Sequence, residues 1–274
     1  MYVPIILHIF RKKYRTGIKT VEFSLDDIRK AALHLGIVAR NPADVVYRMR
    51  SRTRLPDRIL SLGFNIVRQI GRGKYRLEQA ESTLITYEIG KITDALDLTP
   101  LPVRRLLPEK LAEIDEQGLL SVIHYCELLK HFTGLTVYRL RSHVRKSVKG
   151  VGQAELDELD VGVAFRDDEV PVIIPIEAKA SDEPINRVQI AAQVAFARHY
   201  FQDHEVRPIA VKVDHDSLLH FLEFNATAEP RELKVLRSRC YRLLLSEIQL
   251  KYITQTRLAN EAALKLAKEM RKGK

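Results

Sequence analysis

The stretch ELDELDVGVAFRDDEVPVIIPIEAKA, residues 155–180, constrains the fold of this chain more than any other segment. Two apolar runs of strand length flank a charged segment, and both contain many β-branched residues. This pattern predicts two buried strands, at about 157–165 and 170–179, that pair around a turn at 166–169. Charged side chains stand at the strand ends, where burial is costly unless the charge is paired or binds a ligand. The chain must therefore fold around a buried hairpin that carries carboxylates.

The ends of the two predicted strands bring a small set of ionisable side chains together. Pairing around the turn places Glu177 opposite residues 157–159. A period of two then puts Asp157, Glu177 and Lys179 on one face, and Asp160 on the other face unless a bulge intervenes. Two converging carboxylates repel each other without a cation, and their oxygens suit Mg²⁺. With Lys179 beside an attacking water, the pattern predicts phosphodiester hydrolysis. A purely structural ion pair between Glu177 and Lys179 is the alternative.

Basic charge is concentrated at the beginning of the chain. The net charge is +10, and residues 1–78 hold 17 Lys and Arg against 6 Asp and Glu. Clustered cations steer polyanions toward a protein and release their counterions on binding. The N-terminal third is therefore predicted to bind nucleic acid, and a basic surface without a partner is the alternative.

The order of elements in residues 1–80 predicts a winged helix-turn-helix domain. A strand is expected at 3–10, then helices at 24–36, 41–55 and 57–63, and finally a hairpin at 64–79. Ser and Asn caps, a proline in a first turn and glycine stops delimit the helices, and a Gly-Arg-Gly turn closes the hairpin.

The second of these helices has an apolar face and a separate arginine face. Such a helix can enter the major groove while the hairpin contacts phosphates. The side chains predicted to contact DNA from this domain are Arg48, Arg50, Arg52, Arg54, Arg72 and Lys74. Contact with a protein, or a solvated arginine face, are the alternatives.

The rest of the chain predicts an α/β body with a mixed sheet flanked by helices. The expected divisions are a linker with one short helix at 81–108, the body at 109–228, and helices at 229–274. Within the body, the expected elements are a long helix at 108–134, a strand at 135–144, the hairpin, a helix at 185–201 and a strand at 206–214. The strand at 135–144 alternates, with one face buried and the other basic through Arg139, Arg141 and His143; Arg145 and Lys146 follow it.

Asp157, followed by Glu177-Ala178-Lys179 at a strand end, resembles the PD-(D/E)xK nuclease superfamily. More narrowly, the chain is similar over residues 24–215 to bacterial restriction-endonuclease-like proteins that carry an N-terminal DNA-binding domain. The blocks that carry this likeness, in the same order, are RMRSRTRLP, GRGKYRL, DEQGLLSVIHYCELLKHFTGLTVYRLRSHVR, GQAELDELDVGV, and VIIPIEAKA followed by VQIAAQ. The resemblance implies a restriction-endonuclease-like mixed sheet behind the winged helix-turn-helix domain.

The resemblance also implies roles for individual residues. It assigns the metal to Asp157, Glu177 and the carbonyl of Ala178, and the attacking water to Lys179. Further residues that it brings in are Glu116 as another acid, Gln193 as a catalytic amide, Gln189 as a DNA contact, and Glu155 as a flanking side chain. The chain departs from its relatives in having Asp160 where they have an aromatic residue, Glu177 where they often have Gln, and Ala180-Ser181 where they have a Gly pair.

Together these patterns predict an endonuclease of restriction type that needs Mg²⁺, or Mn²⁺ in its place, and cuts double-stranded DNA. A homodimer and a cognate methyltransferase are the expected partners. A DNA-binding regulator with an inactive nuclease fold and a structure-specific repair nuclease stay open as alternatives. The two cysteines, Cys126 and Cys240, form no zinc-type spacing with histidine. No signal peptide or membrane span is evident, so a cytoplasmic protein is expected.

Overall fold

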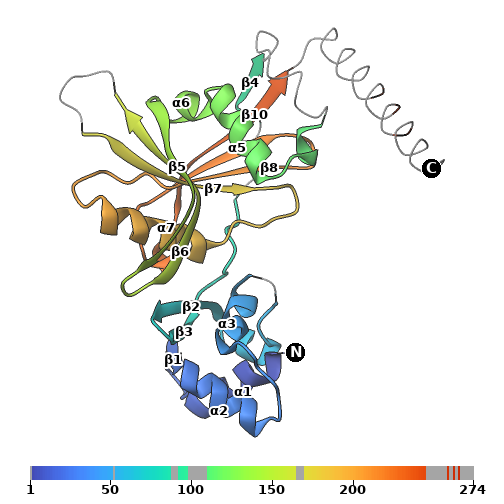
Figure 1. Ribbon diagram of the computed structural model, residues 1–274, viewed down its shortest axis with the longest axis vertical. Coiled ribbons are helices and arrows are strands. Elements are labelled where there is room, and N and C mark those ends of the chain that lie inside the picture. The colour runs from blue at the N-terminus through green and yellow to red at the C-terminus, as the bar shows by residue number, and fades with distance from the viewer. Residues whose placement is uncertain are drawn as a thin grey trace, which may run out of the picture.

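The chain folds into two bodies stacked along the long axis of the molecule, each with its own sheet and hydrophobic core (Figure 1). The computed structural model describes residues 2–51, 53–87, 92–97, 110–164, 170–244, 258, 262 and 265, leaving aside the side chains of residues 50, 51 and 97. Within these ranges no helix combines the length and the apolar character needed to cross a membrane.

The N-terminal body combines helices with a three-stranded antiparallel sheet of order β1-β3-β2. Its elements are α1 (Val3–Lys13), β1 (Thr20–Ser24), α2 (Leu25–His34), α3 (Pro42–Ser51), α4 (Asp57–Leu60), β2 (Phe64–Gly71) and β3 (Lys74–Gln79). A capping box starts α2, because the Ser24 side chain accepts from the backbone of Asp27 while the Asp27 carboxylate accepts from the backbone of Ser24. The three helices and the hairpin expected between residues 24 and 79 are present.

The expected strand at 3–10 is wrong, because these residues form helix α1. Its side chains Ile5, Ile6, Ile9 and Phe10 recur at helical spacing and are all buried in the N-terminal core. The isoleucines favoured a strand locally, but a helix lets one face of the segment pack against its neighbours.

The C-terminal body is built on a seven-stranded mixed sheet of order β4-β10-β9-β8-β7-β6-β5. Its strands are β4 (Asp94–Asp97), β5 (Thr136–Val148), β6 (Gly152–Val163), β7 (Val172–Lys179), β8 (Ile209–Val213), β9 (Leu219–Phe224) and β10 (Val235–Leu244). The helices are α5 (Glu116–Tyr125), α6 (Leu128–Thr133) and α7 (Arg187–Tyr200), with 3₁₀ turns η2 (Leu111–Glu113) and η3 (Pro230–Glu232). The pairs β7–β8 and β10–β4 are parallel, and the other adjacent pairs are antiparallel.

Helices cover both faces of this sheet, as expected from the sequence. Helices α5 and α6 pack on the face that carries Ile174, Ile176 and Ala178 of β7. Helix α7 packs on the opposite face, against Ile173 and the β5–β6 hairpin. Strand β7 is buried along its whole length, which matches the apolar run at 172–176 and makes the burial of Glu177 and Lys179 at its end notable.

Three further expectations about this body are corrected. The short helix expected at 83–96 is not found in its described residues, because 83–87 form no helix and 94–97 form β4, which lies at the sheet edge beside β10. The long helix expected at 108–134 is broken into α5 and α6 at Glu127, whose φ of 51° is incompatible with a continuous helix. Residues 229–244 form η3 and β10 instead of helices, and most of the expected helical tail beyond residue 244 lies outside the described residues.

The alternation expected for the strand at 135–144 is also wrong. This strand, β5, is an edge strand, and Tyr138 and Leu140 on its supposedly buried face are 58% and 46% exposed. A register shift between Arg139 and Arg141 and a φ of 50° at His143 interrupt the period of two. The faces on which Arg139 and Arg141 lie therefore cannot be predicted from a simple period of two.

A buried ion-pair network joins the two bodies. Arg68 of β2 is 7% exposed and contacts Glu78 of β3 and Glu229 near η3, at 2.8 Å in each case. Beside it, Gly152 has a φ of +93°, and a Cβ added there would lie 2.4 Å from the Gln69 side chain. The end of the β5–β6 hairpin thus rests directly on the N-terminal body.

Glu223 of β9 is held by two arginines and supplies pH-dependent stability. Its carboxylate accepts from Arg207 and Arg237, with shortest distances of 2.8 and 2.6 Å. Burial alone would raise the pKa of Glu223, but the two arginines outweigh it and hold the pKa below the ordinary value of 4.5. The stabilisation is therefore present above pH 4.5 and is lost as the pH falls through the lower folded-state pKa. We expect Glu223→Gln to lower the free energy of unfolding by about 1–3 kcal/mol at pH 7. Urea unfolding of both proteins should show this difference shrinking in acid.

Candidate active site

The site begins where β6 separates from β7. The two strands pair from Gly162 with Val172 to Glu158 with Ile176, and the ladder ends there. The next residue of β6, Asp157, uses its carboxylate Oδ2 to accept a hydrogen bond from the backbone N–H of Ala178, at 2.9 Å. The register therefore agrees with the expectation that Glu177 lies opposite residues 157–159, although the strand pairing stops one residue short of it and the expected turn at 166–169 lies outside the described residues.

Glu177 is the central carboxylate of the group and is 1% exposed. Its Oε1 lies 2.5 Å from the Nζ of Lys179, which follows two residues later on β7. Its Oε2 accepts a hydrogen bond from the side-chain amide of Gln193. Gln193 is completely buried on α7, and that helix is started by Asn186, whose side chain accepts from the backbone N–H of Val188.

Burial and the closeness of the carboxylates shift the pKa values of this group. Burial and then the charge of Asp157 raise the pKa of Glu177 to about 7, although Lys179 opposes the shift. Burial also raises the pKa of Asp157 against the Ala178 hydrogen bond and the Lys179 charge. Burial would lower the pKa of Lys179, but the charge and hydrogen bond of Glu177, together with the charge of Asp157, outweigh it and raise the pKa. Such a pair of carboxylates gains stability from a cation between or beside its oxygens.

Two more acids border the group. Glu116 is the first residue of α5, and its charge raises the pKa of Asp157. A hydrogen bond to Glu116, followed by burial, raises the pKa of Glu183, which lies in the loop between β7 and α7. The sequence singled out Glu116 but not Glu183. Only the approach of α5 to that loop in the tertiary structure brings Glu183 to this group.

The structure thus brings Asp157, Glu177, Lys179, Gln193 and Glu116 into one neighbourhood. Ala178 contributes its backbone N–H to Asp157, while its side chain is buried in the core. Gln189 lies on α7 one turn before Gln193 and is half-buried. The backbone carbonyl of Glu155 accepts a hydrogen bond from the side chain of Gln193 at 3.5 Å, whereas the Glu155 carboxylate pairs with Arg145 across the β5–β6 hairpin at 2.7 Å.

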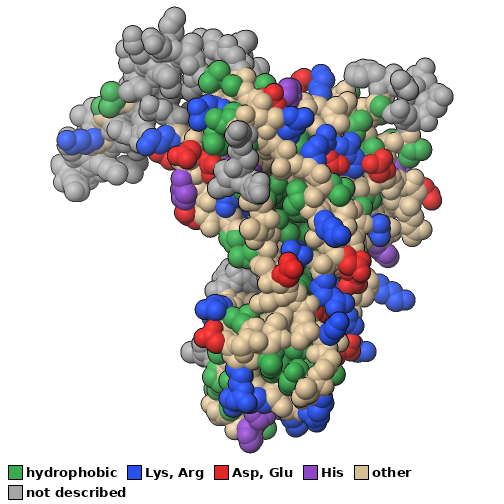
Figure 2. Space-filling view, turned by 180° about the vertical axis from the view of Figure 1, so that it is seen from behind, with side chains coloured by type: hydrophobic (Ala, Val, Ile, Leu, Met, Phe, Trp, Pro, Cys, Tyr) green, Lys and Arg blue, Asp and Glu red, His purple; other side chains and the backbone are tan. Residues whose placement is uncertain are grey.

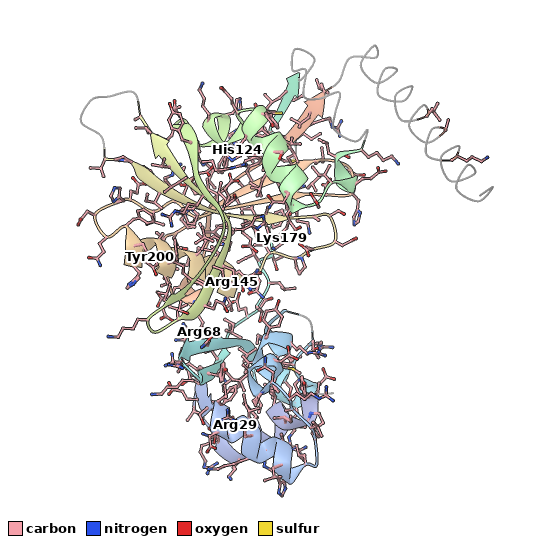
Figure 3. The ribbon with its side chains drawn as sticks, viewed as in Figure 1. Arg29, Arg68, His124, Arg145, Lys179 and Tyr200 are labelled. Carbon is pink, nitrogen blue, oxygen red and sulfur yellow. The ribbon has the colours of Figure 1, made fainter. Side chains whose placement is uncertain are left out.

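The basic residues expected to bind DNA are divided among several surfaces. Arg141, His143 and Arg145 are exposed on β5, and His143 lies close enough for its charge to lower the pKa of Asp157. Arg139 differs, because its Nε contacts Glu158 at 2.7 Å. In Figure 3, Lys179 and Arg145 lie in the part of the C-terminal body nearer the N-terminal body, and Arg68 lies where the two bodies meet.

The described side chains of the N-terminal body that were expected to bind DNA are exposed. Arg48 of α3 is exposed, pairs with Asp44 at 2.9 Å and lies over the Tyr2 ring. Arg54 pairs with Asp57 at 3.1 Å, and Arg72 and Lys74 are exposed at the β2–β3 turn. Figure 2 shows Lys and Arg side chains spread over this body and around the region where the bodies meet. The side chains of Arg50 and Arg52 lie outside the described residues.

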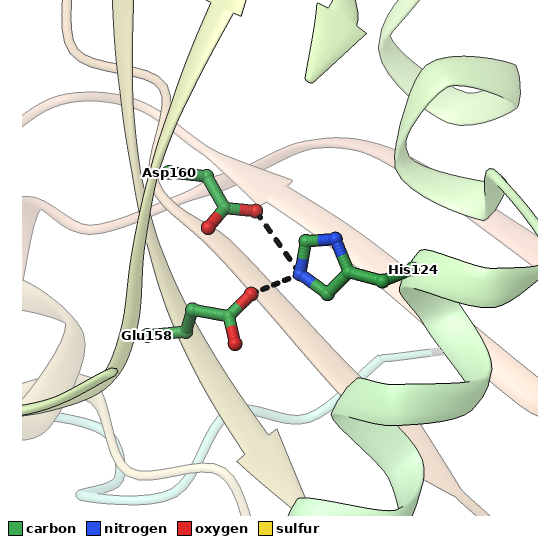
Figure 4. A group of neighbouring side chains, drawn as sticks. All are labelled: His124, Glu158 and Asp160. Carbon is green, nitrogen blue, oxygen red and sulfur yellow. Dashed lines mark hydrogen bonds and ion pairs between the residues drawn. The ribbon is translucent and has the colours of Figure 1, made fainter. Parts of the chain in front are cut away.

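A second group of ionisable residues lies on the other face of β6. Glu158 and Asp160 face α5, where His124 contacts Glu158 directly and approaches Asp160 Oδ2 at 3.4 Å (Figure 4). The expectation that Asp160 points away from Asp157 and Glu177 is therefore confirmed. Burial and the charge of Glu158 raise the pKa of Asp160 to about 9, and Arg139 opposes this shift. Sequence reasoning missed this group, and its one visible signal was a pair of acids two residues apart within an apolar strand.

The chain was compared with protein-family models, with curated proteins and with solved structures. None of these three comparisons gave a match.

Proposed function

We propose that the protein is a Mg²⁺-dependent endonuclease that hydrolyses phosphodiester bonds in double-stranded DNA, with Asp157, Glu177 and Lys179 at its reacting centre. The observation that carries this proposal is the convergence of these three side chains where β6 leaves β7. Burying two acids and a lysine together lowers the stability of the fold, and such groups with shifted pKa values are typical of functional sites.

The donor set fits a magnesium ion. Asp157 and Glu177 supply hard carboxylate oxygens, and burial and then the charge of Asp157 raise the pKa of Glu177. When bound, Mg²⁺ would stabilise negative charge on the phosphate oxygens, and Mn²⁺ could replace it. The chain itself supplies Lys179 to orient the attacking water and Gln193 to hold Glu177 in place. Glu116 is a further acid close to Asp157.

DNA would be held by both bodies. The N-terminal order of helices followed by a hairpin supports a winged helix-turn-helix domain, with Arg48, Arg54, Arg72 and Lys74 near phosphates. On the C-terminal body, Arg141, His143 and Arg145 line the exposed strand beside Asp157. A restriction-type enzyme with these parts would work beside a methyltransferase of the same specificity, and dimerisation would allow both strands to be cut.

Incubation with plasmid DNA tests the proposal directly. We expect wild-type protein to produce cleavage with Mg²⁺ and none with EDTA, and Asp157→Asn to reduce the rate at least about 100-fold. Asp203→Asn, at a residue in the turn after α7, is the matched control and should cleave at the wild-type rate. Discrete fragments would indicate sequence-specific cutting, and preference for branched or mismatched duplexes would indicate a repair nuclease. Absence of metal-dependent cleavage on unmodified genomic DNA would contradict the proposal.

One observation favours a second candidate, a DNA-binding regulator with an inactive nuclease fold. Both oxygens of Glu177 are already contacted, by Lys179 and by Gln193. If these contacts held the group closed, the protein would bind DNA without cutting it. Binding measured by fluorescence anisotropy, together with no cleavage at any Mg²⁺ or Mn²⁺ concentration, would select this candidate.

A further inference from the structure

His124, Glu158 and Asp160 form a group of ionisable side chains that has no role in the proposed nuclease reaction. His124 lies in the last turn of α5, and the two acids lie on β6 with their side chains directed at the imidazole (Figure 4). One ligand-type atom from each side chain lies within 4.8 Å of the other two. The three groups therefore already converge on one point.

Asp160 is the member of this group whose negative charge is least compensated. Its side chain is completely buried, and neither of its oxygens accepts a hydrogen bond from any residue in the described ranges. Buried carboxylates in native proteins are normally hydrogen-bonded or bound to a metal. Asp160 lies beside a second acid, Glu158, and its contact with His124 Nε2 is 3.4 Å long, so a cation held by both acids would relieve their repulsion.

The charge balance points in the same direction. Glu158 is 1% exposed, and its Oε2 is paired with Arg139 at 2.7 Å, which leaves its Oε1 turned toward His124. Metal-bound carboxylates are ionised, and in that state Glu158, Asp160 and Arg139 sum to one negative charge. A divalent cation would compensate this charge.

The donor types identify the class of ion. One imidazole nitrogen and two carboxylate oxygens suit a first-row transition ion such as Zn²⁺ better than Mg²⁺, which prefers oxygen alone. In a tetrahedral site with bonds of about 2.1 Å, ligand atoms stand roughly 3.4 Å apart. His124 Nε2 and Asp160 Oδ2 are 3.4 Å apart, so small side-chain movements at Glu158 would complete the geometry.

A pocket lies beside His124. His124 lines a pocket of about 120 Å³ whose wall includes Glu127 and Thr136. The side chain of His124 keeps 22% exposure, and the Thr136 hydroxyl in the same wall makes no hydrogen bond with a described residue. Water in this pocket could supply a fourth ligand.

We propose that His124, Glu158 and Asp160 form a binding site for one Zn²⁺-class divalent ion, separate from the carboxylate pair of the reacting centre. The ion would fasten the C-terminal end of α5 to β6. Glu116 lies at the other end of that helix, and Asp157 is the residue before Glu158. The role of the site is therefore structural, and it would hold two acids of the reacting centre in register.

Metal titration of the full chain tests this site. All proteins carry Asp157→Asn, so that ion binding at the reacting centre is weakened and any loss of nuclease activity has no influence on the result. Isothermal titration with Zn²⁺ and visible absorption with Co²⁺ are measured for this background and for added His124→Ala, Asp160→Asn or His215→Ala. His215 is the matched control, since it is 72% exposed on a loop beside Asp182.

We expect one Zn²⁺ per chain in the background and in the His215→Ala protein, with a tetrahedral Co²⁺ spectrum. His124→Ala and Asp160→Asn should each weaken Zn²⁺ binding at least about 100-fold, and Zn²⁺ should raise the melting temperature of the background but not of these two variants. Circular dichroism checks their folding, and Asp160→Asn, which keeps the shape and removes the charge, is expected to fold. Equal Zn²⁺ binding in the background and in folded Asp160→Asn would overturn the proposal, and so would the absence of Zn²⁺ binding in the background. A proton shared between Glu158 and Asp160 would then explain how the two acids lie side by side.

Discussion

Replacing Lys179 with alanine is expected to lower the rate of Mg²⁺-dependent DNA cleavage about 1000-fold or more. The ammonium group lies 2.5 Å from Glu177 and is the cation that opposes the rise in the pKa of that carboxyl. The variant would therefore lose the group that we propose orients the attacking water, and Glu177 would hold its proton more tightly, which weakens its affinity for a cation. Single-turnover cleavage of a plasmid, followed on a gel, measures the change.

The control for this prediction separates chemistry from DNA binding. Lys234 is an exposed lysine in the segment between η3 and β10, and Lys234→Ala removes the same charge from a remote part of the surface. Both variants should bind duplex DNA within about threefold of wild type by fluorescence anisotropy, since each loses at most one phosphate contact. A Lys179→Ala protein that cleaves at a tenth of the wild-type rate or faster would show that Lys179 only pairs with Glu177.

Replacing Arg68 with methionine is expected to lower the free energy of unfolding by about 3 kcal/mol. Arg68 is 7% exposed, and its loss leaves Glu78, which is completely buried, without its closest cation. Arg76 and Arg231 remain at 3.5 and 3.8 Å from Glu78, which places the loss at the lower end of the range for a broken buried pair. The loss is measured by urea unfolding at constant ionic strength.

Arg68 also contacts Glu229, so the same variant should loosen the contact between the two bodies. Arg76→Met is the matched control, because Arg76 is more exposed, at 29%, and should cost less than about 1 kcal/mol. The double variant Arg68→Met/Glu78→Met should regain part of the stability, since an apolar pair replaces a buried charge without a partner. A double variant no more stable than Arg68→Met would show that the buried charge is not the cause.

Most of what positions the reacting centre follows from local sequence. The apolar runs on either side of residues 166–169 specify a hairpin, and its pairing brings Asp157 beside Glu177 because side chains in a strand alternate with a period of two. Caps such as Ser24 similarly fix helix starts, because they satisfy backbone groups of the first turn. These features depend on residues close together in the chain, so the sequence alone predicts them.

Other elements depend on partners far away in the chain. Residues 235–244 form an edge-proximal strand because β9 and β4 offer backbone hydrogen bonds on its two sides, whereas their charged sequence is also compatible with a helix. Residues 3–10 form a helix because the N-terminal core accepts one of their faces. Local propensity is too weak to decide such cases, since tertiary packing contributes most of the free energy.

The sequence by itself determined the two-body organisation, the capped helices of the N-terminal body, and the hairpin that aligns Asp157 with Glu177. The tertiary structure alone decided that Glu183 borders this pair and that His124 meets Glu158 and Asp160 on the face of the sheet covered by α5. The break at Glu127, which ends the expected long helix, lies three residues after His124. The physical reason is that strand alternation fixes the face on which a side chain lies, whereas the residue that faces it from another element depends on how helices pack over the sheet.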